Sequence, residues 1–524
     1  MTNSINEVYG TEVFFIIGSN TTETHPIIGA KIKQAKAKGA KIIVAEPRRI
    51  ELADLSDVFL QIKPGTNVAL LNGMLHVIVK EKLHKTDFIS EMTEEFDAMA
   101  KTVEKYTPEM VAEICGISAD DLVKAARMYA TAGTAAIYYA MGITQHSSGT
   151  EGVMSLSNLA LACGHIGKES TGINPLRGQN NVQGACDMGC LPSDFPGYQK
   201  VFNPDALAKF EKAWNCKLSD KVGLTATEIV NKAGAGEIKF LYIMGENPMV
   251  SDPDTAHAKH CLEHTEFLVV QDIFLTETAE LASVVLPACT FAEKDGTFVN
   301  TERRVQKVRK AIEPVGESRV DWMIIQDLMN RFGYVQNFNN VTDIYNEINA
   351  LTPSYGGITH ERLEKGSLQW PCPTKDHPGT KFLHREGKFS RGKGLFKAID
   401  YKPSAELPDA EFPLILTTGR ILYHYHTRTM TGKVEGINNL YSESFVELNP
   451  ATAAKLGVKD AEVISIASRR GKISTKAVVT DKIEEGVLFM PFHFAETNQL
   501  TNTVLDPLCK IPELKVCAVR AEKI

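Results

Sequence analysis

The chain has 524 residues, a formal net charge of −7 and 43% hydrophobic residues. At roughly 150 residues per domain, this length predicts about three or four domains, and the negative charge argues against a nucleic-acid-binding surface. The longest apolar runs, such as 267–270, fall far short of the roughly 18 residues that a membrane-spanning helix needs, and residues 1–6 do not resemble a signal peptide. We therefore expect a soluble, cytoplasmic protein.

The first recognisable unit is a strand, a helix and a second strand near the N-terminus. The apolar runs at 13–17 and 41–45 are predicted to be strands, with a helix at 27–38 between them, and such a connection favours a parallel sheet. A polar turn begins at Gly18, directly after the first strand. Glu46 directly follows the second strand. We expect the α/β alternation to continue along the chain.

A second segment repeats this outline. A strand at 240–244 leads to Gly245, and the next strand leads to Asp272, with nearly the same separation as between Gly18 and Glu46. In doubly wound folds, such a turn and such an acidic residue hold the phosphates and the sugar or base of a nucleotide. Neither segment has a G-x-G-x-x-G fingerprint, and a strand that ends in glycine is usually only a turn. The recurrence nevertheless predicts two nucleotide sites.

Residues 174–189 form the most unusual segment, with one cation, five side-chain amides and three glycines. Amides both donate and accept hydrogen bonds, Arg177 offers a rigid fork of donors for a carboxylate or phosphate, and glycines let the backbone approach a ligand closely. The alternative is a solvated loop. Surface loops rarely choose Asn and Gln over Lys and Glu so uniformly, so we predict a ligand-binding segment.

The ten cysteines are scattered and contain no Cys-x-x-Cys motif, which is typical of reduced, mostly buried thiols. Cys186 and Cys190 form the nearest pair, but three residues separate them and no further cysteine or histidine is near in sequence, which argues against a zinc site. We therefore predict no metal-ligating side chain in this chain.

The C-terminal part has a different pattern. Residues 387–413 show little periodicity, which marks a domain boundary, and a β-rich, barrel-like domain is expected after it. Four segments there are predicted to be short strands: 412–417, 461–467, 471–479 and 486–490. The predicted fold class is thus α/β, two doubly wound dinucleotide-binding domains followed by a β-barrel. The predicted domains are 1–179, 180–385 and 386–524.

Distinctive segments lie at 142–145, 244–248 and 296–306, in the amide-rich stretch around Arg177, and in the barrel around Thr431 and Gly432. Together they resemble the molybdopterin oxidoreductase family, and the resemblance covers essentially the whole chain. Within that family, Arg-Gly-Gln-Asn-Asn-Val-Gln-Gly-Ala-Cys-Asp-Met-Gly at 177–189 is similar to the catalytic (alpha) subunits of formate dehydrogenases. The resemblance implies a molybdenum or tungsten ion held by two molybdopterin guanine dinucleotides, in agreement with the two nucleotide units.

The resemblance also implies which residues line the cofactor, since pyrophosphates suit backbone N–H groups and guanidinium forks, and pterin edges suit amide-like partners. One dinucleotide is expected on Gly18, Asn20, His25, Glu46, Arg48, Gly65 and Asn67. The other is expected on Gly245, Glu246, Asn247 and Asp272. Further cofactor contacts are expected from Gly142, Gln145, Gly178, Gln179 and Asn180, and from the barrel residues Thr418, Arg420, His424, His426, Asn498 and Lys515.

Arg177 is the residue that the resemblance places at the substrate. A guanidinium can bind formate through two parallel hydrogen bonds and turn its C–H toward the metal. Oxidation then releases carbon dioxide, two electrons and a proton, and the reverse reduction of carbon dioxide is possible. The alternative for Arg177 is a structural or pterin-phosphate ion pair. His146 and His165 are weaker candidates, because a lone histidine is more often a structural hydrogen bonder than a proton relay.

Family members begin with a cysteine-ligated iron–sulfur segment and, further on, a selenocysteine or cysteine that ligates the metal beside a histidine. We hypothesise that this chain is the downstream part of such a subunit, started at an internal methionine, and that on its own it is inactive. The alternatives are a non-catalytic cofactor-binding module, or another family member such as a nitrate reductase. The expected partner is an iron–sulfur electron-transfer subunit, a ferredoxin, a hydrogenase or an NAD-linked subunit, but no nucleic acid.

Overall fold

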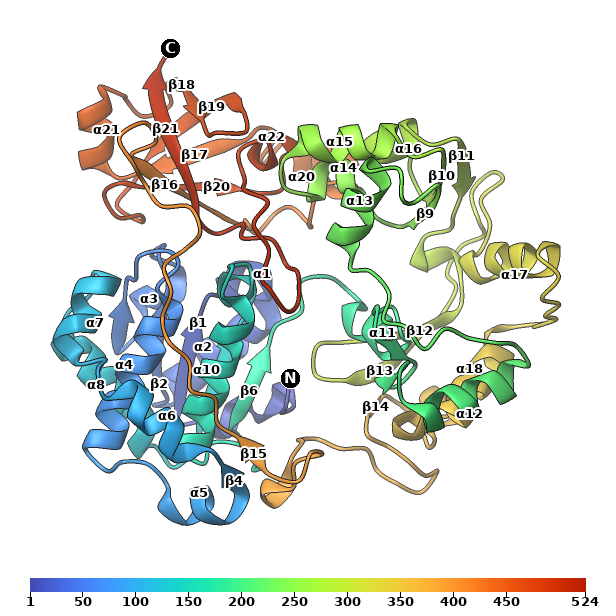
Figure 1. Ribbon diagram of the computed structural model, residues 1–524, viewed down its shortest axis with the longest axis horizontal. Helices are drawn as coiled ribbons and strands as arrows, with labels where there is room; N and C mark the ends of the chain where they lie inside the picture. Colours follow the sequence, from blue (N-terminus) through green and yellow to red (C-terminus); the bar gives the residue numbers. More distant parts are fainter. The chain divides into compact units, whose positions relative to one another are not determined.

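Two units make up the chain in the computed structural model, which describes residues 1–524. The first contains an N-terminal α/β domain and a C-terminal barrel, and the second contains most of the middle of the chain (Figure 1). The first unit comprises Met1–Gly178, Ser251–Thr255 and Phe382–Ile524, and the second comprises Gln179–Val250 and Ala256–Lys381. The amide-rich segment therefore begins in the first unit and continues in the second.

A five-stranded parallel sheet forms the centre of the α/β domain. Its order is β3-β2-β1-β5-β6, so the chain winds outward from β1 first in one direction and then in the other, which is the doubly wound arrangement. The strands predicted at 13–17 and 41–45 are confirmed as β1 and β2. The five strands are β1 (Val13–Ile17), β2 (Lys41–Ala45), β3 (Val58–Leu60), β5 (Ala135–Tyr139) and β6 (Gly172–Pro175).

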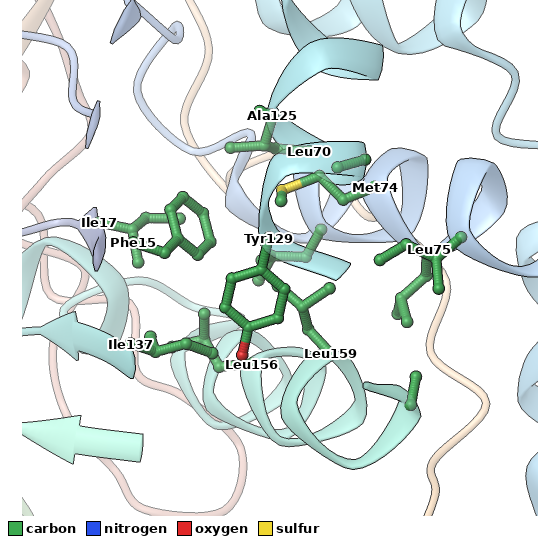
Figure 2. Close-up of a cluster of buried hydrophobic side chains, with 14 of the residues drawn as sticks. Phe15, Ile17, Leu70, Met74, Leu75, Ala125, Tyr129, Ile137, Leu156 and Leu159 are labelled. Atoms are coloured by element: carbon green, nitrogen blue, oxygen red, sulfur yellow. The ribbon is translucent and has the colours of Figure 1, made fainter. Parts of the chain in front are cut away.

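Neighbouring side chains of β1 enter different hydrophobic cores, because successive residues of a strand point to opposite faces. Phe14 and Phe15 are both fully buried, but they belong to separate clusters on the two faces of the sheet. Figure 2 shows Phe15 and Tyr129 within the larger cluster. The Phe14 face is covered by α2 (Pro26–Ala37), and the Phe15 face by α4 (Asn67–Lys80), α8 (Ala119–Thr131) and α10 (Gly149–Ala162).

Shorter elements complete this domain. Thr107 caps α7 (Pro108–Cys115) by accepting from the backbone N–H of Met110, and the helix is followed by Gly116, whose positive φ of 75° suits a helix C-terminus. The short elements are η1 (Ile5–Gly10), α1 (Thr21–Thr24), α3 (Glu51–Asp54), α5 (Thr86–Met92), β4 (Thr93–Glu94), α6 (Phe96–Val103), α7 (Pro108–Cys115) and α9 (Met141–Thr144).

The second unit contains a three-stranded parallel sheet of order β11-β10-β9 and a three-stranded antiparallel sheet of order β12-β13-β14. The parallel sheet comprises β9 (Phe240–Met244), β10 (Phe267–Asp272) and β11 (Val284–Pro287). The antiparallel sheet comprises β12 (Gly296–Val299), β13 (Arg304–Val308) and β14 (Leu368–Gln369). The other elements of the middle region are α11 (Val182–Asp187), β7 (Asp194–Phe195), β8 (Gln199–Lys200), α12 (Pro204–Trp214), α13 (Ala226–Gly234), α14 (Pro248–Ser251), α15 (Thr255–Glu263), α16 (Glu277–Glu280), η2 (Phe291–Glu293), α17 (Asp321–Arg331), α18 (Val341–Leu351), η3 (Pro353–Tyr355) and α19 (His360–Lys365).

The expected C-terminal barrel is confirmed as a closed six-stranded barrel of order β16-β20-β17-β19-β18-β21. Its strands are β16 (Leu414–Gly419), β17 (Phe445–Leu448), β18 (Val463–Ala467), β19 (Lys472–Val479), β20 (Val487–Pro491) and β21 (Cys517–Lys523). Short helices connect them: η5 (Thr431–Lys433), α20 (Glu435–Asn438), α21 (Pro450–Leu456) and α22 (Ala495–Asn498). The four predicted strands correspond to β16, β18, β19 and β20. Two strands, β17 and β21, were not predicted, because charged residues interrupt their apolar runs.

The segment predicted to be a boundary, 387–413, is mostly irregular, yet it is tied to the α/β domain. Within this segment, β15 (Gly394–Leu395) pairs with β4 of the α/β domain. The short helix η4 (Arg385–Gly387) precedes β15. Asn158 Oδ1 accepts a hydrogen bond from the backbone N–H of Lys397 at 3.0 Å, and Asn72 Nδ2 donates to the carbonyl of Ile399 at 2.8 Å. No helix in the molecule combines the length and the apolar character that crossing a membrane requires.

Candidate functional site

The first part of the site is a close crossing of two backbones at the end of the five-stranded sheet. Because β1 and β5 are parallel neighbours, their carboxyl ends meet at one edge, where ligands bind in doubly wound folds. Gly18 has a positive φ of 59°, and its carbonyl accepts a hydrogen bond from the N–H of Gly142 at 3.0 Å. A Cβ on Gly142 would lie 2.5 Å from the Gly18 Cα. Both positions therefore require glycine.

A Gly142→Ala variant is expected to lose about 1–3 kcal/mol of stability, the range for overpacking a close contact. Rigid backbone lies on the other side of the contact, so little can move aside. Gly436→Ala is the matched control, because a Cβ there meets no atom within 4 Å. Urea denaturation measures both, and equal stability of the two variants would refute the steric argument.

Two polar residues line the same edge. Asn67, at the start of α4, donates from Nδ2 to the carbonyl of Gly142 at 3.2 Å, and His146 Nε2 lies 2.9 Å from that carbonyl. His146 is 3% exposed, burial lowers its pKa, and its Nδ1 has no hydrogen-bond partner. Gly65, in the turn before α4, has a positive φ of 88°. Gln145 directly follows the short helix α9 at this edge.

His165 lies elsewhere, inside the hydrophobic core of the α/β domain. Its ring is 0% exposed, packs edge-on against Tyr129 and forms a hydrogen bond of 3.0 Å with the Tyr129 carbonyl. Burial lowers the pKa of His165 to about 4. These contacts are those of a neutral structural histidine.

Arg48 forms a two-pronged ion pair with the barrel. Its Nε and Nη2 donate to the two carboxylate oxygens of Glu447 on β17 at 2.7 and 2.8 Å. The guanidinium carbon of Arg48 also lies over the ring of Phe489, 4.5 Å from the ring centre. Arg48 thus joins the α/β domain to the barrel, and much of its donor capacity is directed at Glu447.

Glu46 and Lys515 bring opposite charges into the interior near this pair. Burial raises the pKa of Glu46 to about 7, against the influence of Lys515 and Arg48. Burial lowers the pKa of Lys515 to about 8, against the influence of Glu46. The ammonium of Lys515 donates to the carbonyl of Thr418 at 2.6 Å. Buried ionisable groups of this kind are typical of sites that receive a charged, hydrogen-bonding ligand.

Replacing Glu46 with glutamine is expected to change how stability depends on pH in the cofactor-free protein. A carboxyl with a raised pKa holds its proton more tightly when folded, so the free energy of unfolding falls as pH rises from 4.5 to about 7. Glutamine does not titrate, so Glu46→Gln removes this loss. The free energy of unfolding of Glu46→Gln minus that of the wild type should therefore increase by about 2 kcal/mol across that pH range.

Urea titrations at pH 5 and pH 7 measure this difference, with the exposed Glu91→Gln as the control. If the two variants show the same pH dependence, the raised pKa of Glu46 is refuted.

The cation of the amide-rich segment lies two residues after the end of β6. Leu176 extends the sheet by donating from its N–H to the carbonyl of Tyr139 at 2.8 Å, and Arg177 comes next. Burial raises the pKa of Tyr139 to about 12, although the charge of Arg177 acts in the opposite direction. His25 Nε2 lies 2.6 Å from the Arg177 carbonyl, and Arg420 Nη1 donates to the carbonyl of Gly178 at 2.9 Å.

The barrel contributes a group of histidines around Arg420, which follows β16. The guanidinium lies 5.4 Å from the ring centre of Phe492, and burial, followed by the charge of Arg420, lowers the pKa of His426 to about 4. His424 Nε2 lies 2.6 Å from the carbonyl of Tyr441. Thr418 Oγ1 donates to the Leu514 carbonyl at 2.8 Å, and Asn498 Nδ2 to the Ser251 carbonyl at 3.3 Å.

In the second unit, a buried carboxylate holds the end of the amide-rich segment, and the sequence analysis did not identify it. Asp187, the last residue of α11, is 0% exposed and accepts hydrogen bonds from four side chains. The donors are Gln183 at 2.8 Å, Tyr198 at 2.8 Å, Trp370 at 2.6 Å, and Tyr355. At the other end of α11, Asn181 Oδ1 accepts from the N–H of Val299 at 2.9 Å. Gln179 and Asn180 directly precede this anchored helix.

The second predicted nucleotide turn also lies at the carboxyl end of adjacent parallel strands. Gly245, after β9, has a positive φ of 63°, and its N–H donates to the Gln271 carbonyl at 2.9 Å. Asp272, at the end of β10, accepts from the N–H of Ile273 at 2.6 Å, and burial raises its pKa. Asn247 is buried and donates to Glu277 at 2.8 Å, whereas Glu246 is exposed.

Comparison with known protein families gives two matches. Residues 1–331 match the model described as molybdopterin oxidoreductase, and residues 414–518 match the molybdopterin dinucleotide binding domain. The second match covers the six-stranded barrel almost from end to end.

Comparison with individual proteins agrees with these family matches. The chain is 53% identical to the F420-dependent formate dehydrogenase subunit alpha of Methanocaldococcus jannaschii, with 100% of this chain and 78% of that protein aligned. It is 42% identical to formate dehydrogenase H of Escherichia coli, over 100% of this chain and 74% of that protein. Acetylene hydratase from Pelobacter acetylenicus has a similar fold, with a TM-score of 0.77 at 20% identity, covering 100% of this chain and 81% of the other.

Proposed function

Because the chain belongs to the molybdopterin oxidoreductase family, we propose that it catalyses the oxidation of formate to carbon dioxide, or the reverse reduction. The similarity of the entire chain to formate dehydrogenase alpha subunits carries this proposal. The segment at 177–189 supports it, since one cation among amides and glycines suits a small carboxylate.

The proposed cofactor is a molybdenum or tungsten ion bound by two molybdopterin guanine dinucleotides. When bound, it supplies the acceptor for the two electrons that formate loses. The donor set at the first sheet edge fits such a ligand, because the buried Nδ2 of Asn20 has no hydrogen-bond partner and the cations of Lys515 and Arg420 lie in the interior. Glu46, with its raised pKa, can accept or donate a hydrogen bond at a pterin or guanine edge.

The second dinucleotide is assigned to the turn after β9, where Gly245 brings backbone N–H groups close to a phosphate and Asp272 can accept from a sugar or base. This division follows three proposed domains, 1–179, 180–385 and 386–524. The remaining cofactor contacts are proposed to come from Gly18, Arg48, Gly65, Asn67, Gly142, Gln145, Gly178, Gln179, Asn180, Glu246, Asn247, Thr418, His424, His426 and Asn498.

Arg177 is proposed to bind formate. A guanidinium forms two parallel, charge-assisted hydrogen bonds to a carboxylate, which fixes both the position and the orientation of the bound molecule. An oriented C–H bond is what a reaction at carbon requires, because correct placement replaces a bimolecular encounter with a reaction inside one complex. Burial lowers the pKa of His25, His426 and His493, so these three rings favour the neutral form.

Electrons are proposed to leave through an iron–sulfur cluster and an electron-transfer partner. The relative from Methanocaldococcus jannaschii is described as F420-dependent. This description favours an F420-linked partner over an NAD-linked one for the present chain. A ferredoxin or a hydrogenase could accept the electrons in the same way.

The test is formate-dependent reduction of an artificial electron acceptor by protein purified without oxygen from its natural source. Metal analysis and release of guanine nucleotide from the same sample establish that the cofactor is present. Formate oxidation by cofactor-loaded protein is the expected result. Loaded protein that turns over nitrate but not formate would reject the proposal in favour of a nitrate reductase, and loaded protein without any turnover would favour a cofactor-binding module.

A further inference from the structure

Two side chains hold consecutive carbonyl groups at the residue proposed to bind formate. His25 Nε2 lies 2.6 Å from the carbonyl oxygen of Arg177, and Arg420 Nη1 lies 2.9 Å from that of Gly178. A backbone carbonyl only accepts hydrogen bonds, so both side chains are donors and Nε2 of His25 carries a proton. A Cβ on Gly178 would lie 2.4 Å from Arg420 Nη2, so a larger residue there would push the guanidinium of Arg420 away from its present position.

His25 is itself firmly placed. It is the single residue between α1 and α2, and Pro26 begins the second helix. Its Nδ1 lies 2.8 Å from Oγ1 of Thr24, whose hydroxyl donates to this nitrogen when the ring carries its proton on Nε2. A ring that is bonded at both nitrogens cannot rotate freely, so the position of its Nε2–H is determined by the turn after β1.

The protonation state of His25 does not alter this contact. Burial, together with the positive charge of Arg420, lowers the pKa of His25 and favours the neutral ring. The neutral ring with its proton on Nε2 donates to Arg177, and the imidazolium would donate there as well. The hydrogen bond should therefore persist across the pH range of catalysis, which is a property of a structural anchor rather than of a proton relay.

We propose that His25 is a positioning residue for Arg177, whose backbone it anchors through the Nε2–H hydrogen bond. The inference rests on the proposed function, in which the Arg177 side chain binds formate. His25 reaches only the main chain in this role, and the guanidinium of Arg177 projects from the backbone that it holds. Because both hydrogen bonds to the carboxylate of formate require the guanidinium fork to be correctly placed, a loosened backbone should weaken formate binding.

Two substitutions separate this role from others. Glutamine can place an amide N–H near the position of Nε2, whereas the shorter asparagine places it near Nδ1. His25→Gln is therefore expected to keep the KM for formate within about threefold of the wild type, and His25→Asn to raise it about tenfold, the effect of one lost hydrogen bond. The kcat per bound metal should change less than KM in both variants, and the pH profile should not change.

A second measurement does not depend on turnover. Hydrogen–deuterium exchange of peptides that cover residues 174–183 should be faster in His25→Asn than in wild type and unchanged in His25→Gln. Metal and guanine nucleotide content should equal the wild-type values in both variants. Exchange still tests the anchor if the wild type fails to oxidise formate, so failure of the proposed function and failure of this inference can be told apart.

Three results would overturn the inference. The first is wild-type KM and exchange in His25→Asn. The second is a rise of KM in His25→Gln as large as the rise expected for His25→Asn. Because His25→Gln is the milder substitution, it tests the role by itself if His25→Asn does not fold. The third is loss of bound cofactor in both variants, which would assign His25 to the cofactor instead.

Discussion

An Arg177→Lys variant is expected to bind formate about a hundredfold more weakly than the wild type, seen as a higher KM. Lysine keeps the positive charge but lacks the planar fork, so it cannot form two parallel hydrogen bonds to one carboxylate. A hydrogen bond to a charged group contributes about 1.5–3 kcal/mol, and each 1.4 kcal/mol corresponds to about a tenfold change in affinity. Steady-state kinetics with an artificial acceptor, normalised to bound metal, measure the effect.

Arg49→Lys is the matched control for this experiment. Arg49 is exposed and pairs with Asp54 at 2.7 Å, so the same chemical change there should leave the KM for formate unaltered. If Arg177→Lys also retains the wild-type KM, Arg177 does not bind formate through its fork. A loss of metal and guanine nucleotide in Arg177→Lys would instead support the alternative role, an ion pair with a pterin phosphate.

Replacing Asp187 with alanine is expected to lower the free energy of unfolding by about 3–5 kcal/mol, the range for removing one member of a buried charged network. The carboxylate accepts from two tyrosine hydroxyls, an indole and an amide, and its removal leaves these donors buried without an acceptor. Because Asp187 ends the helix that follows Gln179 and Asn180, the amide-rich segment should also become more mobile. Denaturant titration gives the stability, and hydrogen exchange gives the mobility.

Two controls separate the network from a general effect of losing a carboxylate. Asp220→Ala changes an exposed residue of the same type and should alter stability by less than about 0.5 kcal/mol. Tyr198→Phe removes a single donor and should cost about 1 kcal/mol. An Asp187→Ala variant that is no less stable than Asp220→Ala would show that the network contributes nothing.

Local patterns were sufficient for much of the fold. The apolar runs at 13–17 and 41–45, with a helix between them, predicted a parallel unit, and the structure contains it as β1, α2 and β2. Four barrel strands were predicted in the same way. The strand at 445–448 was missed because Glu447 interrupts its apolar run, and that carboxylate is buried only because Arg48 meets it there. A pair so distant in sequence leaves no local signal.

The sequence by itself determined the doubly wound sheet, the barrel and the unusual chemistry of residues 174–189, because hydrophobic periodicity and residue type act within a few positions of the chain. Tertiary structure alone decided which partners those residues meet. The Arg177 carbonyl is held by His25 from the turn after β1, and Asp187 by Tyr198, Tyr355 and Trp370. Such contacts form when packed elements exclude water and each buried polar group must find a partner, a condition that the whole fold imposes.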